Sequence, residues 1–233
     1  MLRYLAVLLV FIVPAVAALQ ITIEDENFYP GQKSKSILIT NPSEVPIAVE
    51  ARAVVRTHTI DGKESLDNHF SGLRVLPAQM VIGAGEEQVI NLRLMQAVPS
   101  DVEQALRLII ETVPVTIPQP GQETNTKGGL ELVYRIVRSL YLTPKLASSS
   151  VAVSDVSVDA DKLLITMKNS GNAHQIMYEF TLEIDNQYTF TATTQALKGG
   201  VNLLAGETRE ITLPKPNDWP AGKWTSVKVK SFK

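Results

Sequence analysis

Residues 128–144 read GGLELVYRIVRSLYLTP, a stretch in which apolar side chains alternate with other residues and which ends at a proline. Such alternation predicts a β-strand, because successive side chains of a strand point to opposite faces of a sheet. One face carries Leu130, Leu132, Tyr134 and Ile136, and the other carries Glu131, Val133, Arg135 and Val137. Since both faces hold apolar surface, the stretch is either an ordinary core strand or a strand that pairs with the backbone of a partner.

The residues that precede this strand predict a mobile loop. Residues 114–121 contain three prolines and a glycine, and residues 122–126 are all polar. A loop of this composition buries little apolar surface. A strand that follows such a loop and carries a guanidinium can pair with a partner backbone and bind a carboxylate.

Short apolar runs separated by turn signals extend along the whole chain and predict an all-β protein. In the first half, turns rich in Pro, Gly and Asn separate seven predicted strands, at residues 19–23, 34–40, 47–58, 72–76, 88–95, 105–113 and 130–142. In the second half, the predicted strands are at residues 151–158, 163–168, 175–184, 188–193, 208–213 and 225–229. Seven strands at this spacing are typical of an immunoglobulin-like β-sandwich, and the chain is long enough for two.

The chain divides into three predicted parts. Residues 1–17 have the pattern of a cleaved secretory signal, with Arg3 before an apolar core and small residues at the cleavage site. Residues 145–150, KLASSS, are small and polar, and they separate the two sets of predicted strands. We therefore expect a first domain at residues 18–144, which includes the alternating strand, and a second β-sandwich domain at residues 145–233.

Composition and motifs argue against several classes of function. A formal net charge of −2 over 233 residues does not favour nucleic acid as a partner. The chain has no cysteine, so its stability must come from hydrophobic cores rather than from disulfides. It shows no metal-binding motif, no glycine-rich phosphate loop and no nucleophile motif. The sequence therefore predicts no enzyme, no metal and no cofactor.

Histidines and tryptophans have simpler interpretations than a ligand site. Three histidines show no metal-ligand spacing and are interpreted as surface or locally packed groups: His58, His69 and His174. Trp219 and Trp224 flank a proline and a glycine, and we expect them to pack the end of the second sandwich rather than line a ligand groove.

Three segments, taken in order, resemble the periplasmic chaperones of chaperone–usher pili. They are GLRVLPAQMVIGAGEEQVINLRL at residues 72–94, EQALRLIIETVP at residues 103–114, and the alternating strand at residues 128–144. In the second half, KLLITMKNSGNA at residues 162–173 resembles a strand and turn of the family's second domain. The resemblance rests on the order of these segments, the predicted signal sequence and the two-domain length, and it implies two immunoglobulin-like β-sandwich domains.

In this family, the chaperone lends a strand to a pilin subunit whose own sandwich lacks one, and the strand covers an apolar groove that would otherwise aggregate. The resemblance implies that alternating apolar residues of the lent strand fill this groove: Leu130, Leu132, Tyr134 and Ile136. The opposite frame, which contains Val133 and Val137, would place charged side chains in an apolar groove and is disfavoured.

The resemblance also implies an anchor for the C-terminal carboxylate of the subunit, formed by a basic residue in the cleft between the domains. Arg138 stands where the family has a Lys or Arg near the end of the lent strand. A guanidinium can bind a carboxylate through two parallel hydrogen bonds. Without the resemblance, an arginine paired with a local acid on the sandwich surface would be the simpler interpretation.

Two departures from the family pattern indicate a divergent branch, nearer to the alternative or archaic pilus systems. Many members carry a second basic anchor in the first strand, where this chain has Glu24-Asp25-Glu26. Many also have Arg before the proline that ends the lent strand, and that arginine links the two domains through an acid equivalent to Glu103. Here Thr143 precedes Pro144. The second anchor is therefore in doubt, and we expect no ionic link between the domains through Glu103.

The function implied by the resemblance is that of a periplasmic chaperone whose partners are pilin-like subunits and an outer-membrane usher. A homodimer in which two copies cap each other's lent strand is a further option. One alternative is an exported immunoglobulin-like adhesin or surface component, which would carry an N-terminal donor extension, and none is evident between Ala18 and the first predicted strand. Another alternative is an enzyme or small-ligand binder at the interdomain cleft, for which no nucleophile, metal set or pH-tuned pair is seen.

Overall fold

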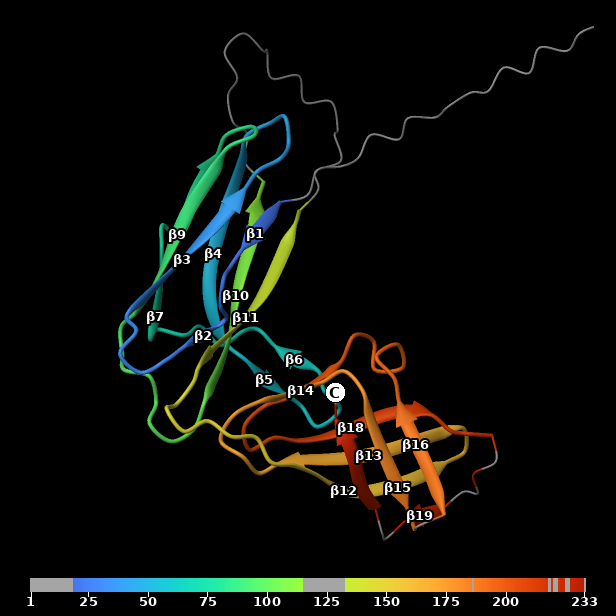
Figure 1. Cartoon of the computed structure of the whole chain (residues 1–233). Coiled ribbons are helices and arrows are strands. Elements are labelled where there is room, and N and C mark those ends of the chain that lie inside the picture. The colour runs from blue at the N-terminus through green and yellow to red at the C-terminus, as the bar shows by residue number, and fades with distance from the viewer. Residues whose placement is uncertain are drawn as a thin grey trace, which may run out of the picture.

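The computed structural model describes residues 19–114, 133–185, 187–217, 219, 222–224 and 227–232. This part of the chain forms strands, and it contains no helix that could span a membrane. Figure 1 shows the strands in two groups, with β5 and β6 between them. The prediction of an all-β chain with two sandwich domains is confirmed. The predicted signal sequence, residues 1–17, lies outside the described residues.

The first domain is a sandwich of two sheets. One sheet has the order β1-β3-β9-β7, with β1 (Gln20–Thr22), β3 (Ser34–Thr40), β9 (Glu87–Leu94) and β7 (Leu73–Leu76). The other has the order β2-β11-β10-β4-β8, with β2 (Asn27–Phe28), β11 (Arg135–Leu142), β10 (Gln104–Val113), β4 (Ile47–Val55) and β8 (Gln79–Ile82). Because β1 and β2 belong to different sheets, residues 23–26 carry the chain from one sheet to the other.

Alternate apolar side chains of the two sheets meet in one core. Its members include seven residues that are exposed by 1% or less: Ile37, Ile39, Ile90, Leu92, Leu106, Leu108 and Ile110. Burial of each such side chain stabilises the folded state by about 1.5–3 kcal/mol. The strands that supply them agree with the alternating segments predicted at residues 34–40, 88–95 and 105–113.

The segment predicted as a single strand at residues 47–58 is divided in the structure. β4 ends at Val55, and β5 (Thr57–His58) pairs with β6 (Glu64–Ser65) in a separate hairpin. The N–H of Thr59 donates to the carbonyl of Lys63 (2.9 Å) and closes the turn. The prediction of one continuous strand is wrong: the alternating sequence pattern continues past Val55, but the chain forms a separate hairpin there, and His58 of this hairpin contacts Glu207 of the second domain.

The second domain has a separate core and three small sheets. Their orders are β18-β13-β12-β19, β14-β17 and β16-β15-β20, with β12 (Val151–Asp159), β13 (Lys162–Asn169), β14 (Gln175–Met177), β15 (Phe180–Ile184), β16 (Tyr188–Ala192), β17 (Val201–Leu203), β18 (Thr208–Pro214), β19 (Gly222–Trp224) and β20 (Val227–Phe232). The strand predicted at residues 175–184 is divided between β14 and β15. Trp219 is 5% exposed and lies 6.1 Å from Trp224 between ring centroids, so both pack the core as predicted.

The segment that connects the two domains is hydrogen-bonded to the second domain. The N–H of Ser148 donates to the side chain of Asn172 (2.8 Å), and the N–H of Ser150 donates to the side chain of Asn169 (3.0 Å). β11 ends at Leu142, on the other side of the connection. The boundary expected between residues 144 and 145 lies between the end of β11 and these hydrogen bonds, and it stays a prediction.

Candidate functional site

β11 has a free edge over most of its length. It pairs with β10 from Arg135, opposite Glu111, to Leu142, opposite Gln104. On its other side, among the described residues, it pairs with β2 alone, through Tyr141 and Leu142. In the part of the chain that the structure describes, the backbone of residues 135–140 therefore has no neighbour strand on this side. Unpaired N–H and C=O groups along such an edge are a template for one more strand.

The two faces of β11 have different surroundings. Ile136, Leu140 and Leu142 belong to the core of the first sandwich or pack against it, so the even-numbered residues face inward. Ser139 and Tyr141 occupy the opposite, outer face. Tyr141 stacks on His174 of the second domain, with ring centroids 3.8 Å apart, so this outer face looks toward the second domain.

Polar contacts hold the beginning of β11 in register. The N–H of Tyr134 donates to the hydroxyl of Thr112 (2.8 Å), and the N–H of Thr112 donates to the carbonyl of Tyr134 (2.9 Å). On the outer face, Glu111 accepts from Arg52 (2.6 Å) and pairs with Arg135. The hydrogen bond from Arg52 lowers the pKa of Glu111. Burial opposes this shift, and the hydrogen bond from Arg135 lowers the pKa further. These contacts fix where β11 leaves the sandwich.

The predicted groove-filling residues fall into three groups. Leu130 and Leu132 lie outside the described residues. Tyr134 is half-buried, and Ile136 packs against the protein's own core. From Ile136 back toward Tyr134, the inward-facing side chains of the strand thus stop packing against the core of the first domain. Val133, which belongs to the opposite row, is 59% exposed.

Arg138 is half-buried on the inner face of β11, opposite Leu108 in the register with β10. Its Nε atom is buried and has no hydrogen-bond partner among the described residues. A buried donor without a partner costs about 1–3 kcal/mol. The surface pairing with a local acid that sequence alone favoured is not seen among these residues, and an anion brought to the free edge would supply the missing acceptor.

A second group of cations, which the sequence interpretation missed, lies on the outer face. Glu64 accepts from the Nε and Nη2 atoms of Arg107 (2.5 and 2.9 Å) and lies 3.2 Å from the Nε atom of Arg56. Arg107 also donates to the hydroxyl of Ser139 on β11 (2.6 Å). Burial alone would raise the pKa of Glu64, but the hydrogen bond from Arg107 and the charges of both arginines lower it. Burial and the charge of Arg107 lower the pKa of Arg56.

Glu103 links the two domains through hydrogen bonds. Its side chain is 1% exposed and accepts from the backbone N–H of His174 (3.0 Å) and from the hydroxyl of Thr143 (3.0 Å). The Nδ1 atom of His174 lies 2.6 Å from the same carboxylate. Thr143 stands where the family has its arginine, so no ionic link of that kind reaches Glu103 among the described residues, and His174 of the second domain joins this carboxylate through hydrogen bonds instead.

We expect Glu103→Ala to lower the free energy of unfolding by about 3 kcal/mol, because it removes the buried acceptor of two donors and the partner of a histidine. Glu103→Gln retains a carbonyl acceptor and should lose less. Urea unfolding followed by circular dichroism measures both, with the exposed Glu44→Ala as the matched control. A loss for Glu103→Ala no larger than that of the control would contradict the interdomain role of this carboxylate.

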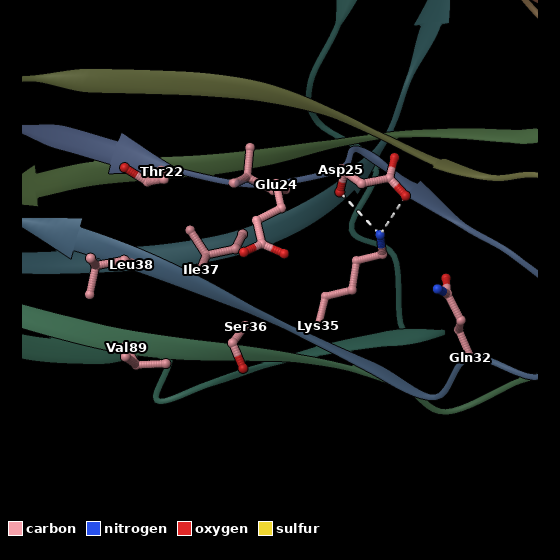
Figure 2. A pocket seen from close by; sticks show the side chains of 10 residues that line it. Thr22, Glu24, Asp25, Gln32, Lys35, Ser36, Ile37, Leu38 and Val89 are labelled. Atoms are coloured by element: carbon pink, nitrogen blue, oxygen red, sulfur yellow. Dashed lines mark hydrogen bonds and ion pairs between the residues drawn. The ribbon is translucent and has the colours of Figure 1, made fainter.

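Two of the acidic residues that replace the family's second anchor, Glu24 and Asp25, line a recess of about 570 Å³ beside β1 and β3. Figure 2 shows Asp25 facing Lys35 of β3 across this recess. The ammonium of Lys35 lies 3.0 Å from the carboxylate of Asp25 and 3.2 Å from its carbonyl oxygen. Asp25 is thus paired with a cation that comes from a neighbouring strand.

Comparison with known proteins assigns the first half of the chain to a family. The model of a family described as pili and flagellar-assembly chaperone, PapD N-terminal domain, matches residues 27–147. No curated protein sequence matches the chain.

Solved chaperone structures share the fold of the whole chain at low sequence identity. One belongs to the CsuC–CsuE chaperone–tip adhesion subunit pre-assembly complex of the archaic chaperone–usher Csu pili of Acinetobacter baumannii. It has a TM-score of 0.63 and 14% identity over 91% of this chain and 92% of that chain. Another belongs to the Salmonella enterica SafA pilin in complex with the SafB chaperone, with a TM-score of 0.55 and 15% identity over 88% and 87%. The E. coli chaperone DraB has a TM-score of 0.54 and 12% identity over 91% and 95%.

Proposed function

Because this chain belongs to the family of pili and flagellar-assembly chaperones, we propose that it binds pilin-like subunits by pairing the free edge of β11 with a strand of the subunit. The observation that carries this proposal is the unpaired backbone of residues 135–140, which is held in place by β10 on one side only. Strand donation by pilus chaperones is an established form of β-strand addition, in which backbone hydrogen bonds give affinity and alternate side chains give specificity.

In this proposal, the inward-facing row of the strand fills the groove of the subunit: Leu130, Leu132, Tyr134 and Ile136. Two facts support this frame. Ile136 is already inward-facing, and the row leaves the chaperone's own core beyond it, where the surface of a subunit can take over. Apolar surface covered in this way contributes about 25 cal/mol per Å². Since Ile136 is partly used by its own core, we assign the larger share of groove filling to the other three.

The C-terminal carboxylate of the subunit binds Arg138 in this proposal. The unpaired Nε of Arg138 supports the assignment, because a carboxylate would give it a charged acceptor at the edge where the subunit strand ends. Arg107 is the competing candidate on the outer face. It already makes two hydrogen bonds to Glu64 and one to Ser139, so it has less capacity for another anion.

The exported chaperone works without catalysis or cofactor in the periplasm, after removal of residues 1–17, and delivers the bound subunit to an outer-membrane usher for fimbria assembly. In the absence of a subunit, a second copy of the chain can occupy the same edge and form a self-capped homodimer. The alternative of an exported adhesin or surface component has no comparable support from the free edge at β11.

Co-purification tests this function. The tagged protein, isolated from the periplasm and analysed by mass spectrometry, should retain a small subunit with an incomplete sandwich. Addition of a synthetic strand peptide from that subunit should compete for the same edge. Retention of no such subunit, under conditions in which the chain is folded and exported, would favour the surface-component alternative.

A further inference from the structure

His58 lies between two carboxylates that belong to different domains. Its side chain is 2% exposed. Its Nδ1 atom lies 2.8 Å from Glu207 of the second domain, and its Nε2 atom lies 4.0 Å from Glu64 of its own hairpin. The hairpin β5–β6 therefore brings a buried imidazole to the domain interface, with one acid on each ring nitrogen.

The other charged groups around His58 leave both acids ionised. Arg56 and Arg107 lie behind Glu64, and Arg209 contributes a positive charge near Glu207. Burial alone would raise the pKa of Glu207, but its hydrogen bonds with His58 and the N–H of Leu204 lower it. The pKa of Glu64 is also lowered, as described above. Both carboxylates therefore stay charged in weak acid.

Contacts that do not titrate already attach the hairpin to the second domain. The N–H of Glu210 donates to the carbonyl of Ile60 (2.7 Å), and the guanidinium of Arg209 donates to the carbonyl of Gly62 (3.3 Å). At the tip, Asp61 and Lys63 form a pair 3.5 Å apart on the exposed side. These contacts hold the hairpin tip on the second domain, and Glu103 with His174 joins the domains at a separate place. His58 adds a further contact between the domains.

A neutral imidazole has one N–H and can donate to only one of the two acids, while its second nitrogen presents a lone pair to the other. A protonated imidazole has two N–H groups and a positive charge, and it can pair with both. Histidine is the side chain that changes protonation between about pH 5 and 8. We propose that His58 is a pH-sensitive latch, which fixes the orientation of the two domains when protonated and loosens it when neutral.

The latch lies next to the candidate site but does not depend on the proposed function. Glu64, which faces His58, holds Arg107 on Ser139 of β11. A change in the position of Glu64 therefore moves Arg107 and, through its hydrogen bond, Ser139 of β11. The test needs only the purified protein, so its outcome is separate from whether a subunit binds.

Spin labels attached to introduced cysteines measure the distance between the two domains. The chain has no native cysteine, so only the introduced positions are labelled. We would introduce Arg93→Cys and Lys162→Cys, two exposed positions in different domains, and compare distance distributions at about pH 5.5 and about pH 8. The expected result is a narrow distribution in acid that broadens or shifts at the higher pH. His58→Gln should abolish this pH dependence, and the exposed His69→Gln should leave it unchanged.

Glu207→Gln is the second variant, because it leaves His58 in place and removes only the charge of the acid across the interface. It should also abolish the pH dependence. An identical distribution at both pH values in the unsubstituted background would overturn the proposal. A pH dependence that survives in His58→Gln but disappears in His174→Gln would also overturn it, and would assign the effect to the other interdomain histidine.

Discussion

Arg138→Glu is expected to abolish subunit capture while the protein remains folded. In the proposed complex, the guanidinium pairs with the C-terminal carboxylate of the subunit at a partly buried site, where loss of one partner of a charge pair costs about 2–5 kcal/mol. Reversal of the charge also sets two carboxylates against each other. The affinity for the subunit should fall by about 100-fold or more. Co-purification and titration calorimetry with the subunit measure this loss.

Two controls isolate the role of Arg138. Arg93→Glu makes the same charge change at an exposed position of β9 in the other sheet and should capture the subunit as the unsubstituted protein does. Arg138→Lys keeps the charge but loses the planar fork, so it should retain part of the affinity. Thermal unfolding of each variant reports whether the fold is intact.

Arg107→Gln distinguishes the guanidinium of Arg107, on β10, from that of Arg138, on β11. If Arg138 is the anchor, Arg107→Gln should weaken capture only modestly, through the loss of its hydrogen bond to Ser139. Capture at full yield by Arg138→Glu together with its loss in Arg107→Gln would move the anchor to the outer face of the strand. Full capture by both variants would remove the carboxylate anchor from the mechanism altogether.

Local pattern predicted most of the strands because alternation and turn residues act within a few positions of each other. The turn that begins at Asn169 is an example, since this buried side chain bonds the N–H of Gly171 within the turn and the carbonyl of Ala173 just after it. The two-residue strands β2 and β6 were not predicted, because a pair of residues has no period. Their existence depends on neighbours that are distant in the sequence.

The interdomain contacts could not be predicted for the same reason. His174 is 71 residues from Glu103, and His58 is 149 residues from Glu207. Neither pair forms a motif, and each histidine considered alone is compatible with a surface position. One usable signal was present: Arg107 interrupts the apolar run of residues 105–110 at an outward position, which indicates a polar surface facing that side of the sheet.

Only part of the candidate site was predicted from the sequence. The strand expected at residues 130–142 runs from Arg135 to Leu142 in the structure, with residues 130–132 outside the described part of the chain. Its free edge follows from a sheet order that no local pattern contains. The resemblance placed Arg138 near the end of the strand, and in the structure it shares the inner face with Ile136. The unpaired Nε of Arg138 could not be foreseen, because it depends on which acids lie nearby in space.

Leu132→Asp is expected to weaken subunit capture far more than Val133→Asp does. If the strand continues the alternation of β11, Leu132 belongs to the inward-facing row with Ile136, and it enters the apolar groove of the subunit. A carboxylate placed in such a groove loses its hydration without gaining a partner. We expect a loss of about 100-fold or more in affinity for Leu132→Asp, which corresponds to about 3 kcal/mol.

Val133→Asp is the matched control, because it adds the same charge one residue away. Val133 is 59% exposed, so an aspartate there stays hydrated in the free protein. In the proposed frame its side chain also points away from the groove, and its affinity should remain within a few-fold of the unsubstituted value, measured with the same subunit. The reverse order of effects would show that Val133 enters the groove, either together with Val137 in the opposite frame or because a β-bulge between Val133 and Ile136 changes the facing of the strand.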